Sequence, residues 1–117
     1  MKPLLLGTML LVTFAAPLTE DQKIEALIQT VDGIKDAAFI RNGKAHDGHA
    51  AAKHLRDKWR GKKSEVKTAR DFIRLCASVS SLTGQPYLIR WKDGREQKSA
   101  DFLSEKLAEL EKGEKGR

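Results

Sequence analysis

The sequence predicts an α+β fold: two helix–hairpin–helix units whose hairpins form a small antiparallel sheet, covered on one face by four helices. Three observations predict it. Four segments carry apolar residues at helical spacing, two short apolar runs are each followed by a turn signal, and the order helix, hairpin, helix occurs twice. The chain has 117 residues, of which 40% are hydrophobic, so its length and composition suit a single domain.

The first helix is predicted over residues 20–34. Thr19 and Gln22 have the spacing of a capping box, in which the two side chains satisfy backbone N–H groups at the start of a helix. Apolar residues then recur every three or four positions, at Ile24, Leu27, Ile28, Val31 and Ile34. This stripe is expected to be buried.

The first hairpin and the second helix follow directly. Residues 38–41 form a short apolar run, Asn42-Gly43 is a strong two-residue turn signal, and residues 44–46 are expected to return antiparallel. Asp47 is a suitable N-cap for a helix over 48–60. Its buried face is predicted to consist of Ala51, Ala52, Leu55 and Trp59.

The second half has the same order of elements. Thr68 with Asp71 predicts the start of a third helix, which is expected to fray near Ser80 and to bury Phe72, Ile73, Cys76 and Val79. Strands are predicted at 87–91 and 95–98, joined by a turn at 92–94. Ser99 is expected to cap a fourth helix with a buried stripe of Phe102, Leu103, Leu107 and Leu110. Residues 111–117 are predicted to be a charged flexible tail.

The two halves, 19–60 and 68–110, have landmarks at one spacing. Thr19 and Thr68, Ile24 and Ile73, and the pairs Ile40-Arg41 and Ile89-Arg90 are all 49 residues apart. An internal duplication explains this spacing, and a chance coincidence of similar capped helices and hairpins explains it equally well. A duplication would let the two hairpins join in one four-stranded sheet.

The N-terminus is typical of a secretory signal peptide. Lys2 supplies a positive charge, an uncharged and mostly apolar run follows from 4 to 16, and cleavage is predicted after Ala15. A membrane-spanning helix needs about 20 apolar residues, and Glu20 comes too early for one. The sequence therefore predicts removal of residues 1–15 and a periplasmic domain over 16–110 that is not membrane-spanning after cleavage.

Metal and cofactor sites are not expected. The chain has one cysteine and three histidines, which is a poor set for a closed four-ligand site, and His49 and His54 are five residues apart rather than three or four. Cys76 is in phase with the apolar face of its helix and is predicted to be buried rather than reactive. No catalytic residue is assigned.

A basic stretch covers residues 53–74, with nine basic and three acidic residues. Its predicted binding residues are Arg56, Arg60, Lys62, Lys63, Lys67 and Arg70. Such a concentration of charge attracts anionic partners. For an exported protein these are an anionic envelope component or an acidic protein, and nucleic acid is not expected. The alternative interpretation is a solvated helix end and loop whose charges only keep the protein soluble.

A hydroxyl-rich turn follows the third helix. Ser80, Ser81 and Thr83, with Arg90 on the next strand, could bind an oxyanion or a peptide terminus. The same hydroxyls could simply cap the helix end and satisfy turn carbonyls. A third interpretation is a small hydrolase, although no serine has a nucleophile-elbow pattern or a base placed beside it by spacing.

Three segments resemble one known family. These are Phe39-Ile40-Arg41-Asn42-Gly43, the stretch from Val66 to Ile73, and above all Ser80-Ser81-Leu82-Thr83-Gly84 with Pro86-Tyr87-Leu88-Ile89-Arg90. They are similar to the YfeK family of small exported bacterial proteins, a domain of unknown function. The resemblance implies a periplasmic location and no particular activity. The sequence thus predicts an uncharacterised exported domain, either a non-catalytic binding or accessory module with a basic surface or, alternatively, a small hydrolase.

Overall fold

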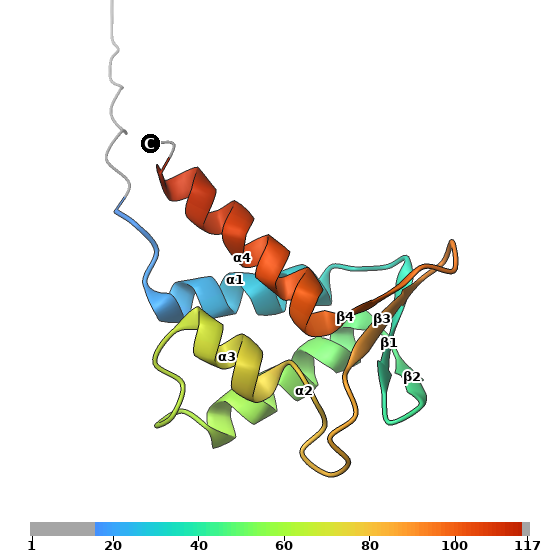
Figure 1. Ribbon diagram of the computed structural model, residues 1–117. Helices are drawn as coiled ribbons and strands as arrows, with labels where there is room; N and C mark the ends of the chain where they lie inside the picture. The colour runs from blue at the N-terminus through green and yellow to red at the C-terminus, as the bar shows by residue number, and fades with distance from the viewer. Residues whose placement is uncertain (1–15, 116–117) are drawn as a thin grey trace, which may run out of the picture.

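The computed structural model describes residues 16–115, so the predicted signal peptide and the last two residues lie outside the described part of the chain. Figure 1 shows four helices and four strands in the predicted order. They are α1 (Glu20–Asp32), β1 (Ala37–Arg41), β2 (Lys44–His46), α2 (Gly48–Gly61), α3 (Ala69–Cys76), β3 (Leu88–Trp91), β4 (Glu96–Lys98) and α4 (Ser99–Lys115). The α+β class is confirmed.

Helices α1, α2 and α3 start where their capping residues predict, whereas Ser99, the predicted cap of the fourth helix, is itself the first residue of α4. Thr19 with Gln22 and Thr68 with Asp71 both form complete capping boxes, and the Asp47 side chain accepts from the Ala50 N–H. The turn between β1 and β2 has Asn42 at φ 54° and Gly43 at φ 78°, the left-handed pair that a tight hairpin requires.

Helix α3 is shorter than predicted. It ends at Cys76. The Ser78 hydroxyl then donates to the Ile73 carbonyl at 2.7 Å, and a side-chain hydrogen bond of this kind competes with the backbone hydrogen bonds that would continue the helix. Val79 was expected in the core. It is instead 44% exposed and forms a bridge with Pro86.

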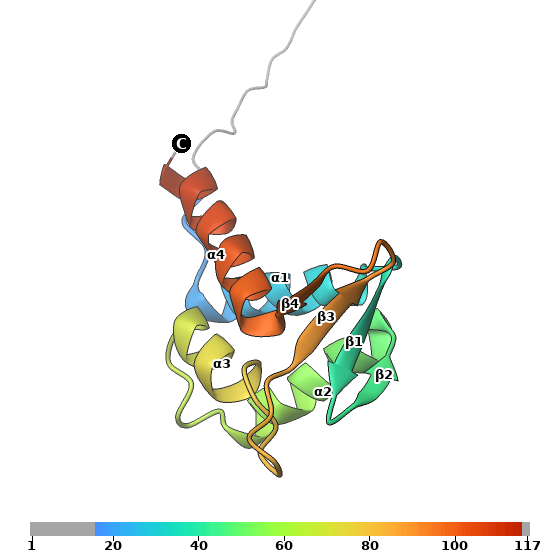
Figure 2. The same ribbon diagram turned by 45° about the vertical axis from the view of Figure 1, so that its right-hand side comes forward.

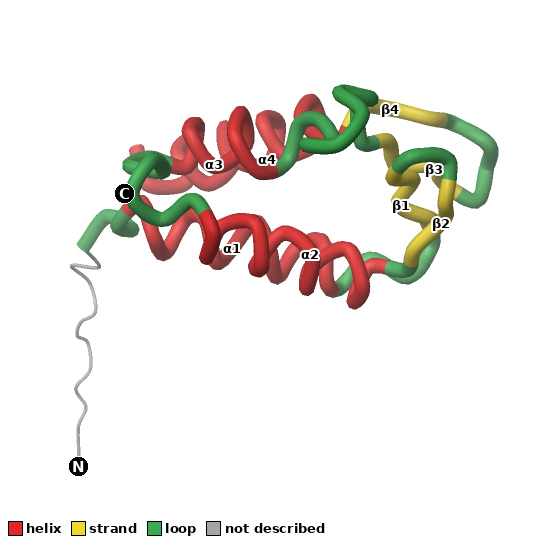
Figure 3. Tube along the Cα trace, turned by 90° about the horizontal axis from the view of Figure 1, so that it is seen from below, coloured by secondary structure: helices red, strands yellow, loops and turns green. Residues whose placement is uncertain are grey.

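The two hairpins form one antiparallel sheet with the strand order β2-β1-β3-β4. Figures 2 and 3 show that the helices lie on one side of this sheet, as predicted, with α1 beside α2 and α3 beside α4. The helix side of the sheet carries Ala37, Phe39, Ile89 and Trp91, which all pack in the core.

The register corrects one assumption of the sequence comparison. Phe39 pairs with Ile89, so residues of β1 and β3 that share a face are an even number of positions apart, and a spacing of 49 joins residues on opposite faces. A slip of one residue moves a side chain to the other face. Ile89 faces the core whereas Ile40 faces away from it, and these two isoleucines are therefore not equivalent. The duplication itself stays a prediction.

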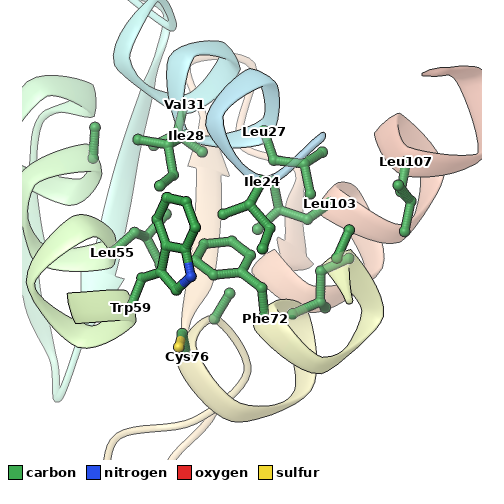
Figure 4. Packing of buried hydrophobic residues seen from close by; sticks show 14 of the residues in the cluster. Ile24, Leu27, Ile28, Val31, Leu55, Trp59, Phe72, Cys76, Leu103 and Leu107 are labelled. Carbon is green, nitrogen blue, oxygen red and sulfur yellow. The ribbon is translucent and has the colours of Figure 1, made fainter. Parts of the chain in front are cut away.

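The core lies between the helices and the inner face of the sheet. Figure 4 shows residues from α1, α2, α3 and α4 converging, with Phe72 edge-on to Trp59 at 6.2 Å between ring centroids. Cys76 is buried, and desolvation raises the pKa of its thiol, so the thiolate is disfavoured. The prediction of a buried cysteine is confirmed.

The predicted flexible tail is wrong for residues 111–115, because α4 continues to Lys115. Lys23 of α1 is buried, and its ammonium contacts Glu111 at 3.2 Å, Glu114 at 3.8 Å and Glu20 at 3.1 Å. The hydrogen bond to Glu20, together with the other carboxylates, raises the pKa of Lys23. Glu114 also accepts from the Leu18 N–H at 2.7 Å. These contacts give the acidic end of α4 the partners that its sequence alone does not reveal.

Over the described residues 16–115, none of the helices combines the length and the apolar character that crossing a bilayer demands.

Candidate functional site

The basic stretch 53–74 does not form one open cationic surface. Four of its predicted binding residues contact carboxylates: Arg56 with Glu25, Arg60 with Asp57, Lys63 with Asp21 and Arg70 with Glu111. Lys63 also lies 4.0 Å from the ring centroid of Trp59. Lys67 is exposed and Lys62 half-buried. Most of this charge is therefore compensated by acidic residues of α1, α2 and α4.

Arg90 does not join the hydroxyl-rich turn. It neighbours the core-facing Ile89 on β3, so it projects from the opposite face of the sheet, where its Nε donates to Glu96 at 2.7 Å. Arg41 is the corresponding arginine of β1. It lies on the same face of the sheet as Phe39, which is the face that the helices cover. The strand alternation thus separates two arginines that the 49-residue spacing had made equivalent.

The turn instead contacts the first hairpin. Asn42 donates from Nδ2 to Ser80 Oγ at 3.1 Å, and Thr83 Oγ1 donates to Asn42 Oδ1 at 2.6 Å. Ser80 Oγ also accepts from the Leu82 N–H at 3.2 Å. Two of the segments that carry the family resemblance are therefore joined by hydrogen bonds, and Ser81 is exposed beside them.

Four polar side chains continue from this junction as one chain of contacts. Arg41 Nη1 is 3.1 Å from His54 Nδ1, His54 Nε2 is 3.2 Å from the Tyr87 hydroxyl, and Lys58 Nζ is 3.2 Å from the same hydroxyl. Lys58 also donates to the Val79 carbonyl at 3.3 Å. β1 supplies Arg41, α2 supplies His54 and Lys58, and Tyr87 directly precedes β3.

The protonation of His54 follows from these contacts. A guanidinium only donates, so His54 Nδ1 must accept and the ring proton must be on Nε2, which donates to Tyr87. Burial lowers the pKa of His54 to about 4, and the positive charges of Arg41 and Lys58 act in the same direction. The imidazole is therefore neutral at pH 7.

Two hydroxyl protons are left without acceptors. The Tyr87 oxygen accepts from His54 and Lys58, and the Ser80 oxygen accepts from Asn42 and Leu82, so both lone pairs of each are used. Tyr87 is 7% exposed and Ser80 5% exposed. Among residues 16–115 no acceptor is recorded for either proton, and neither Arg41 nor Lys58 forms an ion pair there.

These donors border one opening in the surface. It has a volume of about 180 Å³ and is lined by Arg41, Asn42, His54, Lys58, Tyr87 and the loop residues 80–82. We call it the basic pocket. It contains two cations and several hydrogen-bond donors but no carboxylate in its lining, which is the environment that an anionic group requires.

The buried imidazole predicts a pH dependence of stability. The pKa of His54 is about 4 in the fold against 6.5 in a free side chain, so the folded state disfavours protonation of this ring. The contribution of the neutral ring to the free energy of unfolding is therefore complete above pH 6.5 and is lost as the pH falls toward 4. Urea unfolding at pH 7 and at pH 5 should show a free energy of unfolding lower by about 1–2 kcal/mol at pH 5, a figure reduced for the partial solvent access of the ring. His54→Gln should flatten this slope. A slope in this variant equal to that of the parent protein would contradict the assignment.

The pocket offers no activated nucleophile. The His54 lone pair faces Arg41, and within the described residues its contacts include no serine. Nor do residues 16–115 bring three or more histidine, cysteine, aspartate or glutamate side chains together in a group that could hold a metal ion. Anion binding is the chemistry that the donors of this pocket can perform.

Sequence reasoning identified Ser80, Ser81 and the neighbouring Thr83, and it missed Lys58, His54 and Tyr87 as partners. The spacing of the three histidines bears on metal ligation, and it does not predict the contacts of His54 with Arg41 and Tyr87. The resemblance was a usable signal for Tyr87, which is in one of the segments that carry it, but not for His54 or Lys58, which lie outside them.

Comparison with known proteins assigns the chain to a family. A family model described as a family of unknown function, DUF5329, matches residues 18–111. The uncharacterized protein YfeK of Salmonella typhimurium strain LT2 is 41% identical over 68 residues, which cover 58% of this chain and 57% of that protein. No solved structure matches. The resemblance predicted from the sequence is thereby confirmed, and the chain belongs to DUF5329, a family of unknown function.

Proposed function

We propose that this protein is an exported, non-catalytic binding module that recognises an anionic group in the basic pocket. The observation that carries the proposal is the pairing of two cations, Arg41 and Lys58, with two buried hydroxyl donors, Tyr87 and Ser80, that have no acceptor among the described residues. Charge-assisted hydrogen bonds to an anion are about twice as strong as neutral ones. The partner is an anionic envelope component or an acidic protein.

Export is the second part of the proposal, and it rests on the signal-peptide pattern of residues 1–15. It predicts that the protein produced from its full chain is recovered from the periplasm with Ala16 as its first residue. Mass spectrometry of the fractionated protein measures this directly. Recovery of the uncleaved chain in the cytosol would refute export without affecting the pocket.

Anion binding is tested with inorganic phosphate as the probe. Isothermal titration should detect binding that weakens as sodium chloride is added, because exposed charges are screened by salt. Arg41→Gln should lower the affinity about 10-fold or more, since it removes a charged donor from a partly desolvated site. Lys58→Gln should act in the same direction.

Arg90→Gln is the matched control for this experiment. It removes the same charge from the chain, but from the opposite face of the sheet and from an ion pair with Glu96. Its effect on phosphate affinity should be less than about 2-fold, as expected for an exposed charge. Charge reversal of Lys62 and Lys63 tests the basic stretch in turn. If that reversal abolishes binding while Arg41→Gln leaves it intact, the anion binds at residues 53–74 and not in the pocket.

A further inference from the structure

An apolar cavity adjoins the basic pocket. Its volume is about 40 Å³, and its apolar lining includes Val31, Phe39, Leu55, Ala77, Ile89 and Leu103. Arg41, His54 and Tyr87 line both this cavity and the basic pocket. The two spaces are therefore neighbours across these three side chains, which are hydrogen-bonded in a row.

The size of the cavity limits what it can hold. An engineered apolar cavity of about 150 Å³ accommodates benzene, which corresponds to roughly 25 Å³ for each carbon atom. A space of about 40 Å³ accordingly has room for about two carbon atoms. It suits a methyl or ethyl group and excludes an aromatic ring.

The rim of the basic pocket favours an extended ligand, such as a peptide segment, over a small ion. The opening of about 180 Å³ is larger than a carboxylate needs, and Leu82 at its edge is 91% exposed. An exposed leucine beside a pocket provides an apolar surface that a bound segment would cover. The exposed Ser81 of the same loop offers a further hydroxyl for polar contacts.

We propose that the pocket binds the C-terminal carboxylate of a peptide whose last side chain is small and apolar. This inference rests on the function proposed above and names its ligand. Because the two spaces share three lining residues, the charged and apolar parts of the ligand must be close together, and the ligand must part the hydrogen-bonded row of Arg41, His54 and Tyr87 to reach the cavity. The α-carboxylate and side chain of a terminal alanine have this relation. Arg41, Lys58 and the Tyr87 and Ser80 hydroxyls bind the carboxylate, the methyl group occupies the cavity, and the preceding residue contacts Leu82.

Capped dipeptides test this proposal on the purified protein by isothermal titration. N-acetyl-alanyl-alanine should bind about 10-fold or more tightly than N-acetyl-alanyl-glycine, the discrimination typical of one methyl group in an apolar pocket. N-acetyl-alanyl-phenylalanine should bind no better than the glycine peptide. The alanine peptide with a C-terminal amide should show no binding, and propionate, which lacks the peptide backbone, should bind at least 10-fold more weakly.

Each departure from this ranking has a separate meaning. If phosphate and all the carboxylates bind equally well, the basic pocket is an anion site and the terminal-alanine proposal is wrong. If propionate equals the dipeptide, the ligand is a free short-chain acid. If no probe binds, phosphate included, the proposed function fails as well.

Two cavity variants give an independent measurement. Ala51 is half-buried and lines the cavity, so Ala51→Val should remove the preference for the alanine peptide while leaving the weaker glycine peptide unchanged. Leu55→Ala should enlarge the same space and shift the preference toward a terminal valine or leucine. An unaltered ranking in a folded variant of either kind would show that the cavity does not hold the last side chain.

Discussion

Replacement of Leu107 by alanine should lower the free energy of unfolding by about 2–5 kcal/mol. Leu107 has no solvent exposure, and Figure 4 shows it on α4, among the buried residues of the core cluster. The substitution removes apolar contacts and leaves a cavity that the packed surroundings fill only in part. A domain of this size has a total stability of about 5–15 kcal/mol, so the loss is a large fraction of the whole.

Leu82→Ala is the matched control, because it makes the same chemical change at a residue that is 91% exposed. It should alter the free energy of unfolding by less than about 0.5 kcal/mol. Urea unfolding followed by circular dichroism measures both variants. A loss below about 1 kcal/mol for Leu107→Ala would mean that α4 does not pack against the core as described.

Replacement of Gly48 by alanine should also be damaging, lowering the free energy of unfolding by about 1–3 kcal/mol. Gly48 is the first residue of α2, where this helix meets the end of α1. A Cβ atom at this position would be 2.5 Å from the Val31 carbonyl oxygen and 2.8 Å from that of Ile34. Both are backbone atoms, so relief requires α1 to move relative to α2 rather than a side chain to rotate.

Gly61→Ala is the control within the same helix. A Cβ atom there meets nothing within 4 Å, and alanine has the higher helix propensity. This variant should be neutral or more stable by up to about 1 kcal/mol. Equal melting temperatures for the two variants would contradict the close approach of α1 and α2 at Gly48.

Most of the fold could be predicted from short-range signals. Capping residues such as Thr19, Asp47 and Thr68 specify a helix start because their side chains satisfy the free N–H groups of the first turn. Asn42-Gly43 specifies a hairpin because both residues tolerate positive φ. These effects operate within about four residues and need no knowledge of the tertiary structure.

The errors have long-range causes. The end of α4 is helical because Glu111 and Glu114 meet Lys23, and no local pattern reveals a partner about 90 residues away. Arg41 and Arg90 were grouped because a spacing of 49 matched them, whereas the sheet register pairs Arg90 with Ala38, on the face opposite to Arg41. In a strand, one residue of error exchanges the core face for the open face.

The candidate site could be predicted only in part, for the same reason. Ser80, Ser81 and Thr83 were identified by composition, but the pocket also needs the contact of the turn with Asn42 and the position of Tyr87, which contacts His54 of α2. Lys58 was counted among the charges of a basic stretch. Its position beside the Tyr87 hydroxyl depends on how α2 packs on the sheet.

We expect an anion to bind between Arg41, Lys58, Ser80 and Tyr87. Titration of the ¹⁵N-labelled protein with phosphate, against sodium chloride at equal ionic strength, tests this through amide chemical shifts. The largest changes should fall on Arg41, Asn42 and residues 80–87, with smaller ones near His54 and Lys58. Changes confined to residues 60–70, or none above those caused by chloride, would contradict it.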